Sequence, residues 1–190
     1  MESAGALLIF VLIAGAIIFV AIYNGLISSK NNVIRSWSDV AAYQRQKIKL
    51  LPDLEKLTRD YLEYEGSLLR DVTELRASLG RISPTRVDIK ALIDIERRTD
   101  AVLSRFQAVV EDYPDLQSAG LVRDLMAEMT ELEENIAAAI TIFNRNVADF
   151  NSGIEIFPNN VVNALSAKLT IYPAFRDSAA EREIEYQFRG

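Results

Sequence analysis

The chain opens with an apolar run that carries no charged residue from Ser3 to Ser29. At about 1.5 Å per residue, a helix from Ala4 to Ile27 is long enough to cross the ~30 Å hydrocarbon core of a bilayer. A cleavable signal peptide is the alternative, but such peptides begin with a basic segment and have a shorter apolar core, whereas this chain begins Met1-Glu2. The pattern therefore predicts a transmembrane helix between Ala4 and Ile27, within an anchor domain of residues 1–29.

After this run, apolar residues recur every three or four positions, which is the spacing of one face of an α-helix. Four such stretches follow one another, and no strand-like alternation of comparable length occurs. Their apolar members are Val33, Trp37, Val40, Ile48 and Leu51; Leu54, Leu57, Tyr61, Tyr64, Leu68, Val72, Leu75 and Leu79; Leu92, Ile95, Val102, Phe106, Val109 and Tyr113; and Met129, Leu132, Ile136, Ile140, Phe143, Val147, Phe150, Ile154 and Phe157. The pattern predicts an all-α protein.

Three interruptions separate the four stretches: Pro52, residues 80–85 and residues 113–120. Pro52 allows two interpretations, because the apolar phase continues through it as in a single kinked helix. A turn at Pro52 instead gives segments of roughly 27 residues, about 40 Å long, which match one another in length. We therefore expect a turn, and an antiparallel up-and-down four-helix bundle with coiled-coil-like packing over residues 30–157.

The only tryptophan, Trp37, lies in phase with Val33 and Val40 on the apolar face of the first bundle helix. An interfacial anchor or a ligand-stacking face is the alternative for such a side chain. Since Trp37 lies about two helical turns beyond the apolar run, we expect it in the core. The core residues we predict are Trp37, Phe106, Phe143 and Phe150.

The segment after Phe157-Pro158 also has helical spacing. Asn160 is available as a helix cap and Pro173 as a stop, which predicts a short amphipathic helix within a C-terminal domain of residues 158–190. This helix has three possible contacts: its own bundle, the lipid headgroups, or a neighbouring copy of the chain. We expect self-association through Val162, Leu165, Leu169, Tyr172 and Phe175.

The amino-acid composition excludes several kinds of catalytic and metal-binding site. The 190 residues include no cysteine and no histidine, which removes disulfides, thiolate nucleophiles, imidazole bases and the common zinc ligand sets. A net charge of −6 argues against nucleic acid as a partner. We therefore expect no enzyme, no metal, no cofactor and no small-molecule substrate. The alternative is an enzyme or ligand sensor that uses only carboxylates and tyrosines, such as Tyr61, Tyr64 and Glu65.

Three polar clusters fall within the predicted helices. We interpret the acidic cluster Glu128, Glu131, Glu133 and Glu134 as a solvated face, with a metal site as the alternative. We interpret the charges around Thr99, which are Asp94, Glu96, Arg97, Arg98 and Asp100, as helix-face ion pairs, with a partner-binding groove as the alternative. Asn144 and Asn151, one heptad apart and accompanied by Asn146 and Asp149, predict a buried hydrogen-bond network that sets the register of the bundle.

Several short motifs, taken in order, resemble the LemA family of bacterial membrane-anchored helical proteins. They are Tyr23-Asn24-Gly25-Leu26, Trp37-Ser38-Asp39-Val40, Leu50-Leu51-Pro52-Asp53-Leu54, Tyr113-Pro114-Asp115-Leu116, Phe143-Asn144, Phe150-Asn151 and Phe157-Pro158-Asn159-Asn160. The resemblance implies an N-terminal transmembrane helix, an antiparallel four-helix bundle and a turn at Pro52. It supplies no activity. This chain also departs from the family, since it has Ile140-Thr141 where related chains tend to carry an arginine pair.

Charges flank the apolar run on one side only. Lys30, Arg35, Arg45, Lys47 and Lys49 follow it, and no lysine or arginine precedes it. The positive-inside rule then predicts a single-pass protein of the inner membrane, with its N-terminus outside and its C-terminal domain in the cytoplasm. The anchor, the helices and the missing catalytic side chains together indicate a membrane-tethered structural or adaptor protein, whose partners are the lipid bilayer, copies of itself and other membrane or cytoplasmic proteins.

The orientation can be tested with reporters fused after Gly190. We expect a reporter that works only in the cytoplasm to be active and one that works only outside it to be silent, because the basic residues lie on the C-terminal flank. The opposite pair of results would reverse the predicted topology.

Overall fold

The computed structural model describes residues 2–61, 66–112 and 120–176. Within these ranges every regular element is helical. The helices are α1 (Glu2–Tyr61), α2 (Gly66–Arg81), α3 (Ile89–Asp112), α5 (Gly120–Glu155) and α6 (Asn159–Val162), which continues into a π-helix, η1 (Asn163–Ala167). The predicted all-α class is therefore confirmed.

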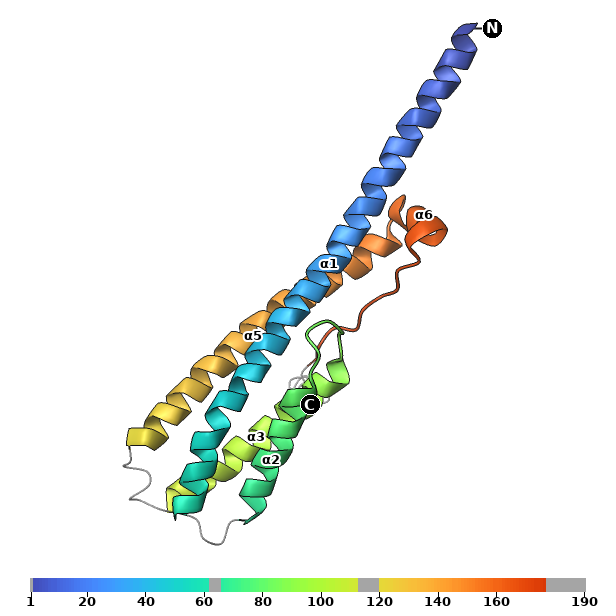
Figure 1. Cartoon of the computed structure of the whole chain (residues 1–190). Coiled ribbons are helices and arrows are strands. Elements are labelled where there is room, and N and C mark those ends of the chain that lie inside the picture. The colour runs from blue at the N-terminus through green and yellow to red at the C-terminus, as the bar shows by residue number, and fades with distance from the viewer. Residues whose placement is uncertain (1, 62–65, 113–119, 177–190) are drawn as a thin grey trace, which may run out of the picture.

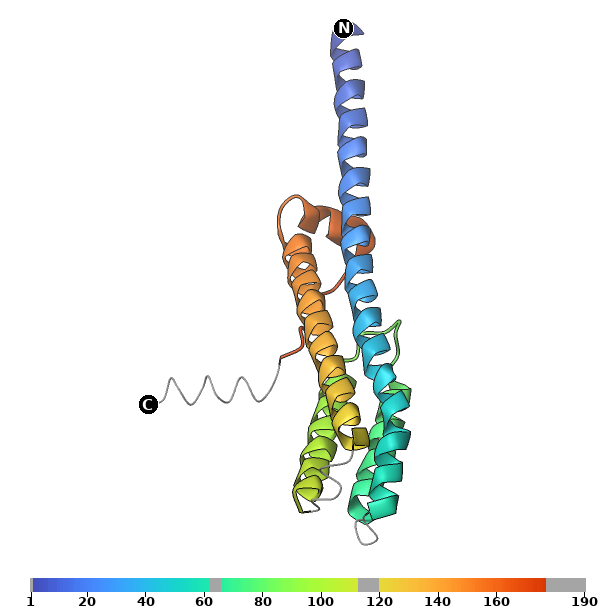
Figure 2. The same ribbon diagram turned by 90° about the vertical axis from the view of Figure 1, so that its left-hand side faces the viewer.

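The first half of α1 projects alone from the rest of the molecule, as Figure 1 shows. The second half of α1 packs against α5 and α2, and α2 packs against α3. Figure 2 shows the same elongated group of helices from the side, with α6 beside α1 where the projecting part begins. The projecting part contains a segment long and apolar enough to cross a membrane, and its large apolar side chains are exposed.

The predicted turn at Pro52 is wrong, because α1 runs through this residue without a break and ends only at Tyr61. A proline inside a helix costs about 3 kcal/mol, since it removes one backbone hydrogen bond and crowds the preceding turn. Burial of one leucine side chain contributes about 1.5–3 kcal/mol. Leu51, Leu54 and Leu57 are all buried, and the Pro52 ring is on the exposed side. The continuous apolar stripe therefore outweighs the proline.

The core holds all four predicted aromatic residues. Trp37, Phe106 and Phe143 are fully buried, and Phe150 is nearly so. The rings of Trp37 and Phe143 are tilted against each other with centroids 5.5 Å apart, a favourable aromatic geometry. The indole Nε1–H donates to the carbonyl oxygen of Ser83, 2.8 Å away, in the connection between α2 and α3. Trp37 thus joins α1 both to α5 and to this connection.

Residue pairs between α1 and α5 run in opposite numerical order. Trp37 lies against Phe143, and further along α1 Lys47 forms an ion pair with Glu133. Arg45 adds a second contact to the connection between α2 and α3, donating to the carbonyl oxygen of Ile82 at 2.7 Å. These contacts show how the elements beside α1 are held to it.

The C-terminal segment differs from the predicted amphipathic helix. Asn160 is not a cap, since the helix starts at Asn159 after Pro158, and the helix ends near Lys168 rather than at Pro173. Lys168 has the left-handed conformation (φ 49°), which takes the chain out of the helix. The Asn163 side chain supports this exit, because its Oδ1 accepts from the Leu169 backbone N–H and its Nδ2 donates to the Leu169 carbonyl. The chain then continues without regular structure to Arg176.

The burial of Trp37 yields a stability prediction. We expect Trp37→Ala to lower the free energy of unfolding by about 3 kcal/mol or more, because it leaves a large cavity and removes the hydrogen-bond donor of the Ser83 carbonyl. Glu131→Ala, on the exposed face of α5, should cost less than about 1 kcal/mol. Equilibrium unfolding of the two full-length variants in mild detergent measures the difference, and equal losses would contradict the assigned role of Trp37.

Candidate functional site

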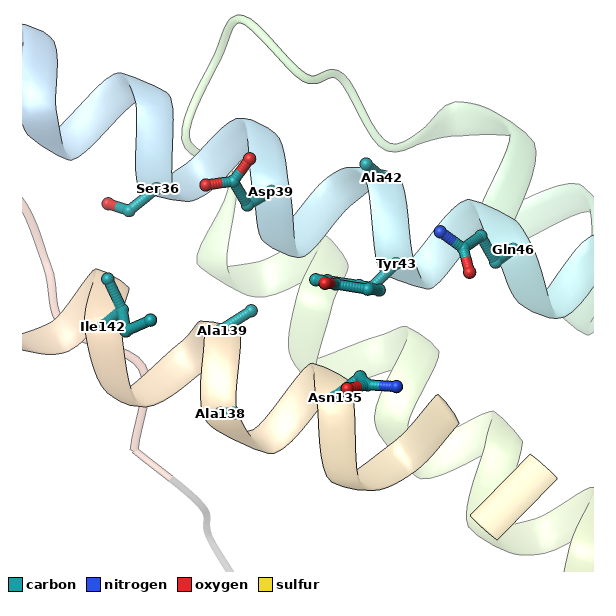
Figure 3. A pocket seen from close by; sticks show the side chains of 9 residues that line it. All are labelled: Ser36, Asp39, Ala42, Tyr43, Gln46, Asn135, Ala138, Ala139 and Ile142. Atoms are coloured by element: carbon teal, nitrogen blue, oxygen red, sulfur yellow. The ribbon is translucent and has the colours of Figure 1, made fainter. Parts of the chain in front are cut away.

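A groove with a volume of about 510 Å³ lies between α1 and α5. Its lining residues, shown in Figure 3, are Ser36, Asp39, Ala42, Tyr43 and Gln46 from α1, and Asn135, Ala138, Ala139 and Ile142 from α5. The small alanine side chains leave the space between the two helices unfilled. The Tyr43 ring extends from α1 into that space.

A second hollow of about 200 Å³ continues this groove along the same two helices. It shares Gln46 and Asn135 with the first and adds Lys49, Glu128 and Glu131. The groove therefore changes along its length, from alanines and Ile142 at one end to charged side chains at the other.

The lining of the groove mixes apolar and polar side chains and carries little charge. Asp39 is the one charged residue of the larger hollow, and no basic side chain faces it there. No group of three acidic residues able to hold a metal ion occurs in the described part of the chain.

A buried polar layer crosses the core near the middle of the helices. The Lys47 side chain has 0% exposure, and its Nζ lies 2.8 Å from Glu133 Oε1 and 3.4 Å from Glu96 Oε1. Nζ also donates to Thr99 Oγ1 at 3.3 Å, and the buried Gln44 amide donates to Glu96. One lysine thus joins α1 to both α3 and α5.

Burial raises the pKa of the Glu133 carboxyl above its ordinary value, and the neighbouring charges of Glu96 and Asp100 act in the same direction. The ion pair and hydrogen bond with Lys47 oppose this shift without overcoming it. The interpretation of the acidic cluster as a solvated face is therefore wrong for Glu133, which turns toward the core. It is correct for the other three members, which are exposed: Glu128, Glu131 and Glu134.

The sequence contains a signal for this buried polar layer, which is the presence of polar residues at core positions of the helices. Gln44 and Lys47 fall in step with Trp37, Val40, Leu51 and Leu54 on the buried stripe of α1, and Thr99 falls between Ile95 and Val102 on that of α3. Polar residues at core positions need polar partners, because an unpaired buried group is costly.

The charges on the outer side of α3 form ion pairs with each other and with α2. Arg98 contacts Asp94 at 2.7 Å and Glu74 at 2.6 Å, and Arg105 contacts Asp71 at 2.6 Å. The bond from Arg98, reinforced by Arg97, lowers the pKa of Asp94, and the same bond raises the pKa of Arg98. Helix-face pairing is therefore confirmed for Asp94, Arg97 and Arg98 and is wrong for Glu96, which pairs with the buried Lys47 of α1. The hollow of about 270 Å³ beside α3 has its arginines already paired. Such exposed pairs add little stability.

Asn144 and Asn151 have a different role from the predicted one. Each side chain makes two hydrogen bonds to the backbone of one residue in the segment after η1, residues 168–176, which we call the tail. Asn151 bonds Tyr172 (2.8 and 2.9 Å), and Asn144 bonds Phe175 (2.9 and 2.8 Å). The distance between the two asparagines along α5 matches the distance between their two partners along the tail, since seven residues of helix rise about 10.5 Å and three residues of extended chain span about 10 Å. With Asn163 and Leu169 these pairs form an asparagine ladder that holds the tail, rather than a network that sets helix register.

The residues predicted for self-association do not form one exposed surface. Val162 is buried, and Leu169, Tyr172 and Phe175 pack partly buried against the core of their own chain. Tyr172 also lies against Phe150, with ring centroids 5.4 Å apart. Leu165 alone among the five is exposed. Of the residues suggested as an enzymatic alternative, Tyr61 is the last residue of α1, and Tyr64 and Glu65 fall outside the described residues.

Fold and sites together define an all-α protein that carries, at its N-terminus, one helix long and apolar enough to cross a membrane. The sequence pattern of the LemA family matches residues 36–188, and this chain belongs to that family.

Relatives show how far the similarity extends. Protein LemA of Metamycoplasma hominis is 26% identical over 179 residues, covering 93% of this chain and 79% of that protein. Magnetosome protein MamQ of Magnetospirillum gryphiswaldense is 23% identical over 158 residues, covering 72% of this chain and 58% of that protein. Magnetosome protein MamQ 2 of Paramagnetospirillum magneticum is 24% identical over 160 residues, covering 73% of this chain and 59% of that protein. This chain therefore spans under two thirds of the length of the two MamQ proteins, and none of these names specifies a reaction.

The raised pKa of Glu133 yields a pH prediction. The folded chain binds a proton at Glu133 more tightly than the unfolded chain, so this contribution to stability is complete below the ordinary pKa and is lost as the pH rises through the raised value. Glu133→Gln keeps the shape and stays neutral, while Lys47 retains Glu96. We therefore expect Glu133→Gln to gain stability relative to the native chain as the pH rises from acidic to neutral.

Denaturant unfolding at a series of pH values measures this difference, and Asp94 contributes equally to both chains and cancels. Glu134→Gln removes one charge from the exposed face of the same helix and is the matched control. If Glu133→Gln instead loses stability over this pH range, the attraction of Lys47 outweighs the cost of burial.

Proposed function

We propose that this protein is a single-pass membrane-tethered adaptor of the inner membrane that self-associates through the groove between α1 and α5. Its helical domain is an antiparallel up-and-down four-helix bundle in the cytoplasm, and it catalyses no reaction. The observation that carries the proposal is that α1 is both the apolar segment and one wall of the groove.

The continuity of α1 couples the groove to the membrane. Because one helix holds both, the groove from Ser36 to Gln46 begins about 14 Å and ends about 29 Å past Ile27 along the helix axis. A partner bound there is held close to the bilayer at a set height. Lys30, Arg35 and the later basic residues support a cytoplasmic position for the groove.

The bundle topology is supported by the opposite order of contacts between α1 and α5, from Trp37–Phe143 to Lys47–Glu133. It is also supported by Lys47, which places α3 and α5 against the same point of α1. Short connections between long helices favour neighbours that alternate in direction.

A second copy of the chain is the partner we favour. Copies anchored by the same span face the same way in the membrane, so a two-fold axis along the membrane normal can bring their grooves together. Each groove offers a hollow with Ala139 at its floor and Ala138 at its edge, and a ridge at Ile142, which is 58% exposed. Insertion of each ridge into the facing hollow buries apolar surface on both copies.

The proposal is tested by filling the groove. Ala138 is exposed at its edge, and Ala138→Arg places a long charged side chain in the hollow. We expect it to weaken self-association of the full-length protein in mild detergent at least about tenfold, equivalent to about 1.4 kcal/mol. Mass measurement of the assembly over a dilution series gives the change.

Ala77→Arg, at an exposed position of α2 outside the groove, is the control and should leave the assembly unchanged. A native protein that stays monomeric throughout, or the same dissociation constant for both variants, contradicts self-association through this groove.

A further inference from the structure

Four large apolar side chains are exposed at the end of the molecule from which α1 projects. Phe157 is 80% exposed, Leu165 72%, Ile156 57% and Val161 46%. They come from α6, from η1 and from the two residues that follow α5. We name these four residues the collar. Large exposed apolar side chains gathered in one short segment of a folded domain point to a binding surface.

The collar lies at the height where the apolar run of α1 ends. Both α6 and η1 contact α1. Val162 of α6 and Leu26 of α1 are buried in the same cluster, and Ile22 packs against it. Figures 1 and 2 both show α6 beside α1 where α1 leaves the other helices. Since Leu26 precedes Ile27 by one residue, the collar lies beside the point at which a spanning helix leaves the hydrocarbon core.

The polar groups of this segment are directed into their own chain. Asn159 Nδ2 donates to the Gly153 carbonyl at 3.0 Å, Ser166 Oγ donates to the Val162 carbonyl at 2.6 Å, and Asn163 bonds the backbone of Leu169. No charged residue occurs from Ile156 to Ala167. The outward surface therefore carries no charge, and besides the four collar residues it presents the exposed Asn160, whose Oδ1 accepts from the Val161 backbone N–H.

We propose that the collar inserts into the interfacial region of the lipid bilayer, beside the exit of α1. This inference rests on the membrane tether proposed above. The occupant is lipid because the collar continues the exposed apolar surface of α1, whose last large members are Phe19, Val20 and Tyr23. Aromatic side chains such as Tyr23 and Phe157 favour this depth, where an apolar ring meets the polar headgroups.

Insertion of the collar has a mechanical consequence. A single span fixes where the helical domain attaches and leaves its tilt and rotation free, because neither is set by span length alone. A second contact beside the first restricts both. The collar thus orients the helices relative to the bilayer, and the groove between α1 and α5 with them.

Environment-sensitive labels test the proposal cleanly, because the native chain has no cysteine and each variant carries only one. Phe157→Cys and Leu165→Cys place a fluorophore on the collar, and Leu12→Cys places one in the span. Ala77→Cys is the control, at an exposed position of α2 outside the groove. The full-length variants are reconstituted in vesicles of phosphatidylcholine and phosphatidylglycerol, with quenchers either attached to the lipid chains or dissolved as iodide.

We expect lipid-attached quenchers to act several-fold more strongly on the collar labels and on the span label than on position 77, and iodide to show the reverse order. If iodide quenches the collar labels as strongly as the label at position 77, while the span label is still quenched from the lipid, the collar proposal is wrong and the membrane tether is still supported. A span label without lipid quenching overturns the tether itself. Collar labels shielded from both quenchers show contact with a second copy and also overturn the proposal.

Discussion

The continuous apolar stripe of α1, from Leu26 to Leu57, is the feature on which the rest of the structure depends. It gives α5 and α2 a surface to pack against, and its burial outweighs the cost of Pro52 within the helix. Because the same helix also contains the apolar N-terminal run, no joint separates the proposed anchor from the helical domain. A position along α1 therefore corresponds to a height above the proposed membrane, for the collar and for the groove alike.

Polar residues within that stripe determine which helices meet. A core of aliphatic side chains alone tolerates shifts in helix register, whereas Lys47 finds its carboxylates only when Glu96 of α3 and Glu133 of α5 lie opposite it. The net contribution of such a layer to stability is small, since burying charge costs about as much as pairing recovers. Its value lies in the specificity of the arrangement. The raised pKa of Glu133 reflects the same balance.

Different faces of α5 serve different ends of the molecule. Phe143, Val147 and Phe150 enter the core, Ala138 and Ile142 border the groove, and Asn144 with Asn151 holds the tail. The ladder bonds only backbone groups of Tyr172 and Phe175, so it fixes the path of the tail while leaving their rings to pack on the core. By tying the chain down after η1, it also keeps α6 against α1, where the collar is displayed.

The all-α class, the apolar N-terminal helix and core aromatic residues such as Trp37 and Phe143 could be predicted from the sequence. These features depend on local periodicity, which any helix with a buried face must show. The family resemblance, carried by short motifs, is likewise confirmed by the match over residues 36–188. Tertiary structure decided the continuity of α1 at Pro52, the inward turn of Glu133 and the pairing of Asn144 with Phe175. Each of these depends on contacts between distant parts of the chain. Burial of leucines outweighs the cost of Pro52, and Glu133 faces Lys47, which is 86 positions away in the sequence. Asn144 and Asn151 bond an extended segment in which three residues span the same length as seven residues of helix. Periodicity reports which face of a helix is buried, whereas the partner of each side chain is decided by the packing of segments that are distant in the sequence.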